Sequence, residues 1–166
     1  AEDELRIAAT TFQIQDGLVV TDASGVIVRV NQAFSDVSGY SQEEAIGQTP
    51  AILNSGQHDE AFYREMWSSL LTTGKWQGEI WNKRKNGDIF PEWLTITAVR
   101  DVEGRISHYV GAYRDISEHK AAEEAIRNLA FYDPLTSLPN RRLLLDRLQQ
   151  GMATSARNGL HGALIF

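Results

Sequence analysis

The segment TDASGVIVRVNQAFSDVSGYSQEEAIGQ, residues 21–48, begins with the signals of a β-hairpin. Runs rich in β-branched residues, 18–21 and 26–30, flank the turn sequence DASG. The Asp22 side chain can accept hydrogen bonds from the backbone of its own turn, and Gly25 tolerates a positive φ. We therefore expect two paired strands at the start of a sheet.

Helical signals follow the hairpin in two places. Residues 31–47 predict short helices, because Ser41 and Glu44 have the spacing of a capping box and Gly47 suits a helix end. The clearest helix is expected over residues 60–71, where large apolar side chains recur at helical spacing: Phe62, Tyr63, Met66, Trp67 and Leu70.

Three further strands are predicted at 75–85, 88–99 and 106–117. Asn86-Gly87, a strong hairpin signal, joins the first two, and Pro91 suggests an edge position or a bulge in the second. Strands joined by tight turns form an antiparallel sheet. We expect an α+β domain over residues 15–117, with a five-stranded antiparallel sheet, helices covering one face, and a capping helix over residues 1–14.

The composition excludes several kinds of function. The chain has 166 residues and a net charge of −6, which argues against a nucleic-acid partner. It has no cysteine, so disulfides, thiolate nucleophiles and cysteine-based metal sites are excluded. No apolar run approaches the roughly 18–20 residues of a membrane span, and the N-terminus does not have the pattern of a signal peptide. We expect a cytoplasmic segment without membrane contact, whose parent protein can still be anchored upstream.

Alternation along the predicted strands places polar groups on the apolar face of the sheet. Ile80 and Asn82 share a face with Trp76, and Glu92 lies among apolar neighbours on the next strand. A buried amide and a buried carboxylate each need hydrogen-bonding partners. From the residues alone, those partners are either a ligand between sheet and helices or other groups of the protein.

The sequence resembles the PAS domain, a sensory module of bacterial signalling proteins. The resemblance rests on residues 21–48, on FYREMWSSLLTTGKWQGEIWNKRKNGDIFPEWLTITAVRDVEGR (62–105) and on YVGAYRDIS (109–117). NQAFSDVSGY together with the closing RDIS is the most specific pair. The resemblance implies the PAS fold and a central pocket. The candidate ligand-contacting residues are Asn82, Trp67, Glu92, Tyr113, Ile80 and Trp76.

Within that family, the FAD-binding redox sensors are the most similar subclass, since they share the pattern of Trp67, Trp76, Gly78, Asn82, Arg84 and Lys85. Val19 and Pro50 depart from that subclass. In the light-sensing LOV subclass, Pro50 occupies the place of the reactive cysteine, so that photocycle is excluded. Haem is disfavoured because helix 60–71 has no histidine and His58 is expected in a solvated loop. The cofactor stays open between FAD, an unidentified small metabolite and an empty core, and no metal site is expected.

DPLTSLPNRR, residues 133–142, resembles the start of a GGDEF domain, the diguanylate cyclase that makes cyclic di-GMP. That family usually has glycine at the position of Ser137. The resemblance implies that Asn140 would contact the guanine of GTP. Residues 131–166 then form only the N-terminal fragment of that domain, so this chain should not be an enzyme. The parent protein is expected to be a diguanylate cyclase, with or without a phosphodiesterase domain.

Residues 118–130 join the two regions and predict an amphipathic linker helix. Ala122, Ile126 and Leu129 follow a coiled-coil rhythm, which favours a homodimer formed through the linker and N-terminal helices. The expected function is a sensory module that passes a ligand- or redox-dependent change through this helix to the cyclase. The alternative is a ligand-free PAS dimerisation scaffold. A further expectation is that the tail, including GALIF, packs on another chain.

Overall fold

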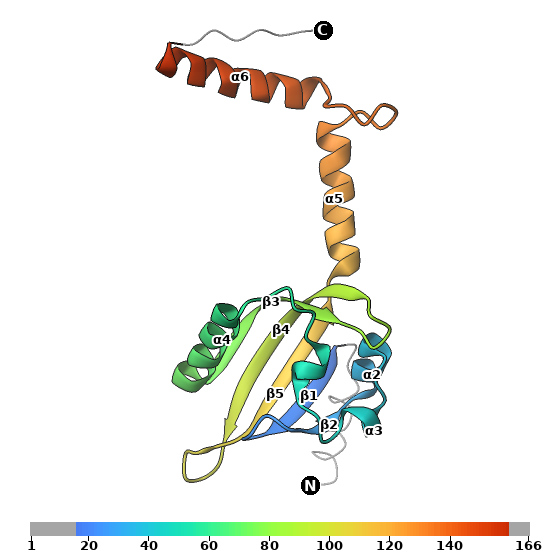
Figure 1. The fold of residues 1–166 in the computed structure, drawn as a ribbon, viewed down its shortest axis with the longest axis vertical. Helices are drawn as coiled ribbons and strands as arrows, with labels where there is room; N and C mark the ends of the chain where they lie inside the picture. Colours follow the sequence, from blue (N-terminus) through green and yellow to red (C-terminus); the bar gives the residue numbers. More distant parts are fainter. Residues whose placement is uncertain (1–15, 160–166) are drawn as a thin grey trace, which may run out of the picture. The chain divides into compact units, whose positions relative to one another are not determined.

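The computed structural model describes residues 16–159. The helix expected over residues 1–14 and the end of the tail from residue 160, which includes GALIF, lie outside the described part. The packing of the tail, residues 131–166, on another chain stays a prediction. The chain divides into two compact units between Ser117 and Glu118. The first unit contains the sheet drawn in Figure 1.

The sheet has five antiparallel strands, as the sequence predicts. Their order across the sheet is β2-β1-β5-β4-β3. The hairpin at Asp22 forms as expected, because Asp22 Oδ1 accepts hydrogen bonds from Ser24 N and Val26 N, and Gly25 has a φ of 86°. The strand bounds are β1 Gly17–Asp22, β2 Ile27–Val30, β3 Lys75–Lys83, β4 Ile89–Arg100 and β5 Ile106–Asp115.

The helices of the first unit lie over one face of the sheet (Figure 1). They are α2 Gln32–Ser38, α3 Gln42–Ala45, the 3-10 helix η1 Pro50–Leu53, and α4 Glu60–Thr73. The predicted capping box at Ser41 and Glu44 forms. Gly74 ends α4 with a φ of 76°, a conformation that glycine adopts without a steric cost. The α+β arrangement with helices on one face is therefore confirmed.

Asn31 joins α2 to the sheet, which sequence patterns did not predict. Its side chain is 3% exposed. Oδ1 accepts hydrogen bonds from Phe34 N (2.9 Å) at the start of α2 and from Leu18 N (2.8 Å) in β1. Nδ2 donates to Asp16 O at 2.9 Å. One buried amide therefore satisfies three backbone groups and fixes where α2 begins on the sheet.

The hydrophobic core is concentrated on one half of the sheet. Its buried cluster comes from β1, β2, β5 and the short helices: Val19, Ile27, Val30, Phe34, Ala45, Leu53 and Tyr113. Burying each of the larger side chains of this cluster, such as Ile27 and Phe34, contributes on the order of 1.5–3 kcal/mol. The cavity described below adjoins this cluster and extends from Val19 and Tyr113 to Ile80 on β3 and Met66 on α4.

Pro91 corrects the expectation of an edge strand or a bulge. β4 lies between β5 and β3, and its pairing with β3 runs through Pro91 without a register shift. Trp81, which is opposite Pro91, directs its N–H to His58 and its carbonyl to Ser55. The pairing of β4 with β5 begins only at Glu92. The missing proline N–H therefore falls where the ladder needs no donor.

The second unit holds a turn between two helices. They are α5 Ser117–Phe131, which starts at the last residue of the first unit, and α6 Arg141–Asn158. Asp133 Oδ1 accepts hydrogen bonds from Leu135 N, Thr136 N and Thr136 Oγ1, which fixes the turn and lowers the pKa of Asp133. Ser137 has a φ of 56°, a conformation that costs a non-glycine residue on the order of 1–2 kcal/mol.

Candidate ligand-binding site

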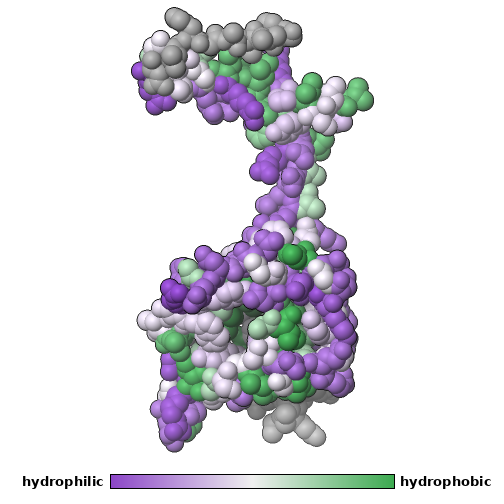
Figure 2. All heavy atoms as spheres, viewed as in Figure 1, coloured by the Kyte–Doolittle hydropathy of each residue, from purple (hydrophilic) through white to green (hydrophobic). Residues whose placement is uncertain are grey.

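A cavity of about 410 Å³ lies between the sheet and the helices of the first unit. This volume is in the usual range for small-molecule sites. Figure 2 shows the same face hollowed, with hydrophobic atoms inside the hollow. The sheet supplies the floor: Val19, Thr21, Ile80, Asn82, Glu92, Leu94, Ile96, Tyr109, Gly111 and Tyr113. The walls come from the β1–β2 turn, from η1 and from Tyr63, Met66 and Trp67 of α4.

Asn82 and Glu92 form the polar centre of this cavity. They come from β3 and β4, and each points to the helix-covered face because of strand alternation. Asn82 Nδ2 donates to Glu92 Oε1 at 2.8 Å. Glu92 Oε2 is buried and makes no hydrogen bond to any of residues 16–159. The sequence left two kinds of partner open, a ligand or other groups of the protein. Asn82 and Glu92 are partners of each other, and Glu92 Oε2 is still available to a ligand.

The environment of Glu92 keeps its carboxyl neutral. The side chain is 1% exposed, and desolvation raises its pKa to about 8. The hydrogen bond from Asn82 lowers that pKa, the nearby Asp115 raises it further, and Arg84 lowers it. At pH 7 a carboxylic acid rather than a carboxylate therefore faces the cavity.

Aromatic side chains make up much of the apolar surface around this pair. The Tyr113 hydroxyl donates to Phe34 O at 3.3 Å, and burial raises the pKa of Tyr113. Trp67 packs edge-on against Tyr109, with ring centroids 5.4 Å apart. Trp67 is 41% exposed, so its indole lies at the mouth of the cavity rather than in its interior.

The structure brings five of the six candidate ligand-contacting residues to one cavity. Asn82, Trp67, Glu92, Tyr113 and Ile80 line it, and Trp76 does not. The Trp76 ring instead packs edge-on against Phe62 of α4, with ring centroids 5.8 Å apart, and lies over Gly78. Strand alternation correctly predicted the face of β3 on which Trp76 lies. Trp76 does not reach the cavity, because α4 covers that end of β3 directly.

Sequence reasoning missed several polar residues that line the cavity, among them Thr21, Tyr63 and Asn54. Thr21 is 5% exposed and donates its hydroxyl to Asp22 O. Tyr63 Oη donates to Asn54 Oδ1 at 3.4 Å, and both residues lie at the cavity wall. Tyr63 could have been found from its spacing of four residues before Trp67 on the same helix face. Asn54 lies in the loop after η1, and no periodic pattern in the sequence predicts that it lines the cavity.

His58 is structural rather than solvated, which corrects the expectation. Its Nε2 accepts a hydrogen bond from Trp81 N at 2.9 Å. Its ring stacks on Phe62, with centroids 4.0 Å apart. The Ser55 hydroxyl donates to the Trp81 carbonyl, so residues 54–58 are attached to the outer side of β3. Over residues 16–159, no group of three or more His, Asp and Glu side chains could hold a metal ion.

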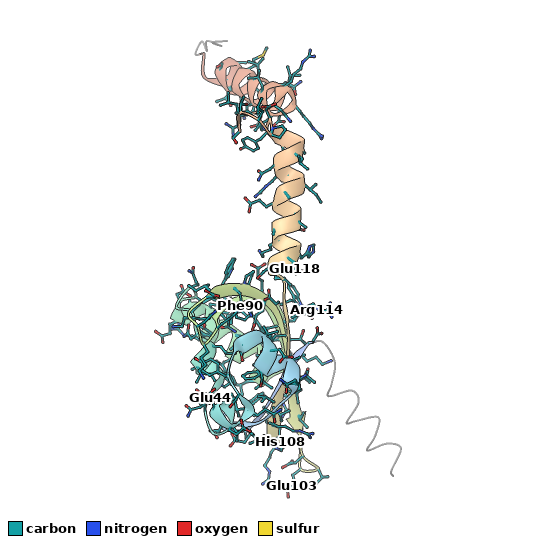
Figure 3. The ribbon with its side chains drawn as sticks, turned by 90° about the vertical axis from the view of Figure 1, so that its right-hand side faces the viewer. Glu44, Phe90, Glu103, His108, Arg114 and Glu118 are labelled. Carbon is teal, nitrogen blue, oxygen red and sulfur yellow. The ribbon has the colours of Figure 1, made fainter. Side chains whose placement is uncertain are left out.

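An ion pair lies beside the cavity, where β5 ends. The Arg84 guanidinium donates to Asp115 Oδ2 and to Val37 O, and it stacks over the Phe90 ring at 3.9 Å. Asp115 Oδ1 accepts from Ser117 N at 2.8 Å, at the start of α5. Figure 3 shows Phe90 and Arg114 near this end of the sheet, and Glu103 and His108 at the other end.

Of the candidate residues in the second unit, Asn140 has a structural role and the three linker residues are exposed. Asn140 caps α6, because its Oδ1 accepts from Arg142 N and Leu143 N. Its Nδ2 donates to Ala130 O at 2.9 Å. The contact of Asn140 with guanine therefore stays a prediction. Ala122, Ile126 and Leu129 are exposed on α5, with Ile126 and Leu129 at 68% and 70%.

Comparison with known proteins identifies the family. A model described as the PAS fold matches residues 6–116, more than half of the chain. The chain therefore belongs to the PAS family, which the sequence motifs predicted. No helix among residues 16–159 is long and apolar enough to cross a membrane.

Curated relatives include signalling proteins. The chain is 34% identical over 116 residues to the nitrogen fixation regulatory protein of Klebsiella oxytoca, covering 70% of this chain and 23% of the relative. It is 32% identical over 145 residues to the aerotaxis receptor of Escherichia coli strain K12, covering 87% and 26%. The chain spans about a quarter of the length of these relatives.

Solved structures show the same fold. The PAS domain of a protein from Colwellia psychrerythraea is 31% identical with a TM-score of 0.65, over 69% of this chain and 98% of that chain. A light-oxygen-voltage domain studied with a flavin analogue is 29% identical with a TM-score of 0.57, over 75% of this chain and 93% of that chain. The chain is thus a PAS sensory domain similar to those of signalling proteins.

Proposed function

We propose that this PAS domain is the sensory module of a cyclic-di-GMP signalling protein. A small molecule binds in the cavity, and the resulting change passes through α5 to a diguanylate cyclase domain that begins near residue 131. The observation that supports a ligand is Glu92 Oε2, a buried oxygen without a hydrogen-bond partner among residues 16–159, on a residue that lines the cavity. Buried polar groups without partners are rare in proteins, and a ligand would supply one.

A flavin is one ligand of the required kind, and the cavity accommodates part of it. Asn82 and Glu92 would hydrogen-bond the polar edge of the ring, and Ile80, Leu94 and Tyr109 offer apolar surface. Among the described residues that line the cavity, none is Lys, Arg or His, so the phosphates of FAD would lie outside it. A bound flavin would supply reversible redox chemistry. Val19 and Pro50, which depart from the redox-sensor pattern, both line the cavity.

The position of Asp115 supports transmission from the cavity to α5. Asp115 pairs with Glu92 across the β4–β5 ladder. It also accepts the Ser117 N–H at the beginning of α5. A ligand that shifts Glu92 would therefore act on the residue whose carboxylate accepts the first backbone N–H of α5. Such a shift moves a conformational equilibrium only if the ligand binds the two states unequally.

The first test is an absorption spectrum of the purified chain, followed by heat release and mass spectrometry of any bound molecule. A two-band yellow spectrum would identify a flavin, and a released colourless molecule would identify a metabolite. The paired variant is Asn82→Ala, with Gln77→Ala on the exposed face of the same strand as the control. Asn82→Ala should weaken ligand retention at least tenfold, because a buried hydrogen bond is lost, and Gln77→Ala should not.

Transmission is tested in the full-length parent by inserting one residue into α5 between Ala122 and Ile126. Insertion rotates the following helix by about 100°, so cyclase activity and its regulation should change. Unchanged regulation would contradict the role of α5. A chain that retains no ligand, whose parent is regulated normally with Asn82→Ala, would instead support the dimerisation scaffold that the exposed Ile126 and Leu129 favour.

A further inference from the structure

The two oxygens of Glu92 have different surroundings. Oε1 accepts the hydrogen bond from Asn82 Nδ2 at 2.8 Å, as the carbonyl oxygen of a carboxylic acid does. Oε2 is buried and has no hydrogen-bond partner among residues 16–159, and Glu92 is one of the residues that line the cavity. In a protonated carboxyl, the hydrogen therefore belongs on Oε2, where it needs an acceptor.

Among the described residues, no group donates a hydrogen bond to Glu92 Oε2, and Arg84, whose charge lowers the pKa of Glu92, is paired elsewhere. Arg84 is already bound to Asp115, and Asp115 itself stands opposite Glu92 on β5 with like charge. The titratable side chains that face the cavity from β5 and α4 are tyrosines: Tyr109, Tyr113 and Tyr63. Within the described lining there is no Lys, Arg or His. An ionised Glu92 would be costly here, and an anionic ligand would add a second uncompensated charge.

We propose that Glu92 binds the ligand as a neutral carboxylic acid, donating from Oε2 to a carbonyl oxygen or ring nitrogen of an uncharged ligand. This inference rests on the proposed function and narrows it. Amides, lactams, quinones and uncharged heteroaromatic rings meet the requirement. Small carboxylic acids and phosphates do not, because their charge has no partner in the cavity.

Ligand binding is consequently sensitive to pH. Burial raises the pKa of Glu92 to about 8 in the protein. Below that pH the donor on Oε2 is present, and above it the proton is lost and the oxygen repels the ligand acceptor. The affinity should therefore fall about tenfold for each pH unit above the pKa of Glu92. The same cavity then reports alkalinity as well as ligand concentration.

The experiment uses riboflavin and FMN, which share a ring and differ by a phosphate. Binding to the ligand-freed chain is followed by quenching of flavin fluorescence at pH 6.5 and 9. We expect riboflavin to bind about tenfold more weakly at pH 9, and FMN to bind no more tightly than riboflavin. Glu92→Gln, which keeps a neutral acceptor and donor of similar size, should bind riboflavin with the same affinity at both pH values.

Two results would overturn the inference: a riboflavin affinity independent of pH, or no riboflavin binding. A second measurement uses the unmutated chain, so that it does not depend on whether Glu92→Gln folds. With ¹³C-labelled glutamate, the Glu92 carboxyl should titrate near pH 8, and titration below pH 6 would also overturn the inference. If riboflavin fails but another molecule is released on heating, the proposed function stands and only the ligand class is wrong.

Discussion

Glu92 illustrates how one residue can be unfavourable for stability and useful for binding. Its side chain is 1% exposed and has one hydrogen-bond donor, Asn82. A protein of this size could fill that position with an apolar residue and gain stability, since an unsatisfied buried polar group costs about 1–3 kcal/mol. Binding sites commonly keep residues that lower stability, because a bound ligand then supplies the missing hydrogen bond.

The first prediction concerns the pH dependence of stability. The folded state keeps the Glu92 proton up to about pH 8, whereas the unfolded chain loses it near the ordinary value of 4.5. The folded state therefore binds the extra proton between these values, and the free energy of unfolding falls as pH rises through this window. The slope from this one group is about 1.4 kcal/mol per pH unit.

The measurement is urea unfolding of the wild type and Glu92→Gln at pH 5, 6, 7 and 8. The variant should gain stability relative to the wild type as pH rises, because Gln has no proton to lose. Glu65→Gln removes an exposed carboxylate from α4 and serves as the control. A difference between Glu92→Gln and wild type that stays constant from pH 5 to 8 would show that Glu92 is ionised when folded.

Ser137 gives the second prediction. Its φ of 56° is strained for serine and comfortable for glycine, the residue that the resembling GGDEF family has there. Ser137→Gly should stabilise the turn by about 0.5–1 kcal/mol, after allowing for the greater freedom of glycine when unfolded. The Ser137 N–H, which donates to Asp133 O, should then exchange with deuterium about two- to fivefold more slowly. Ser137→Ala is the control, because alanine is strained at the same φ. Faster hydrogen exchange of the residue 137 N–H in Ser137→Gly than in the wild type would contradict the prediction.

Among the secondary-structure elements, α2 depends most on a single side chain. Asn31→Ala removes three buried hydrogen bonds, including those to Leu18 N and Asp16 O. We expect a loss of about 3 kcal/mol in the free energy of unfolding. Asn31→Asp keeps the oxygen that accepts and loses only the donor, so it should cost less. A change below about 0.5 kcal/mol for Asn31→Ala would mean that α2 is held by packing alone.

The end of the sheet gives the next prediction. Arg84→Ala removes the ion pair with Asp115, the donor to Val37 O and the cover over Phe90. Because the pair is about three-quarters buried, we expect a loss of about 2–3 kcal/mol in urea unfolding. Arg64→Ala, which breaks an exposed pair with Glu60 on α4, should cost under about 0.5 kcal/mol. Equal effects of the two variants would show that the buried pair has no special role.

Much of this arrangement could be predicted from sequence, because strand alternation and turn residues are local signals. They placed Asn82 and Glu92 on the covered face and located the hairpins at Asp22 and Asn86. Long-range contacts were not predictable in the same way. The orientation of the Trp81 backbone explains Pro91, and the contact of His58 with that backbone depends on a loop that returns to β3. Neither fact is encoded by a periodic pattern.

For the chain as a whole, the second unit leaves an apolar surface exposed. Ile126 and Leu129 are 68% and 70% exposed on α5. We expect them to pair with the same residues of a second chain, since exposed coiled-coil positions bury apolar area on association. The double variant Ile126→Ala/Leu129→Ala should raise the dimer dissociation constant at least tenfold by light scattering. Glu123→Ala is the control, and a monomeric wild type would contradict the prediction.

The loop attached to β3 has a consequence for how such chains can assemble. An outermost strand normally presents free N–H and carbonyl groups, which can recruit a strand from another molecule and start aggregation. At Trp81 both groups are already occupied, by His58 and Ser55. A foreign strand cannot form a continuous ladder along this margin without first displacing that loop. At this position the sheet is thereby protected from open-ended growth through β3.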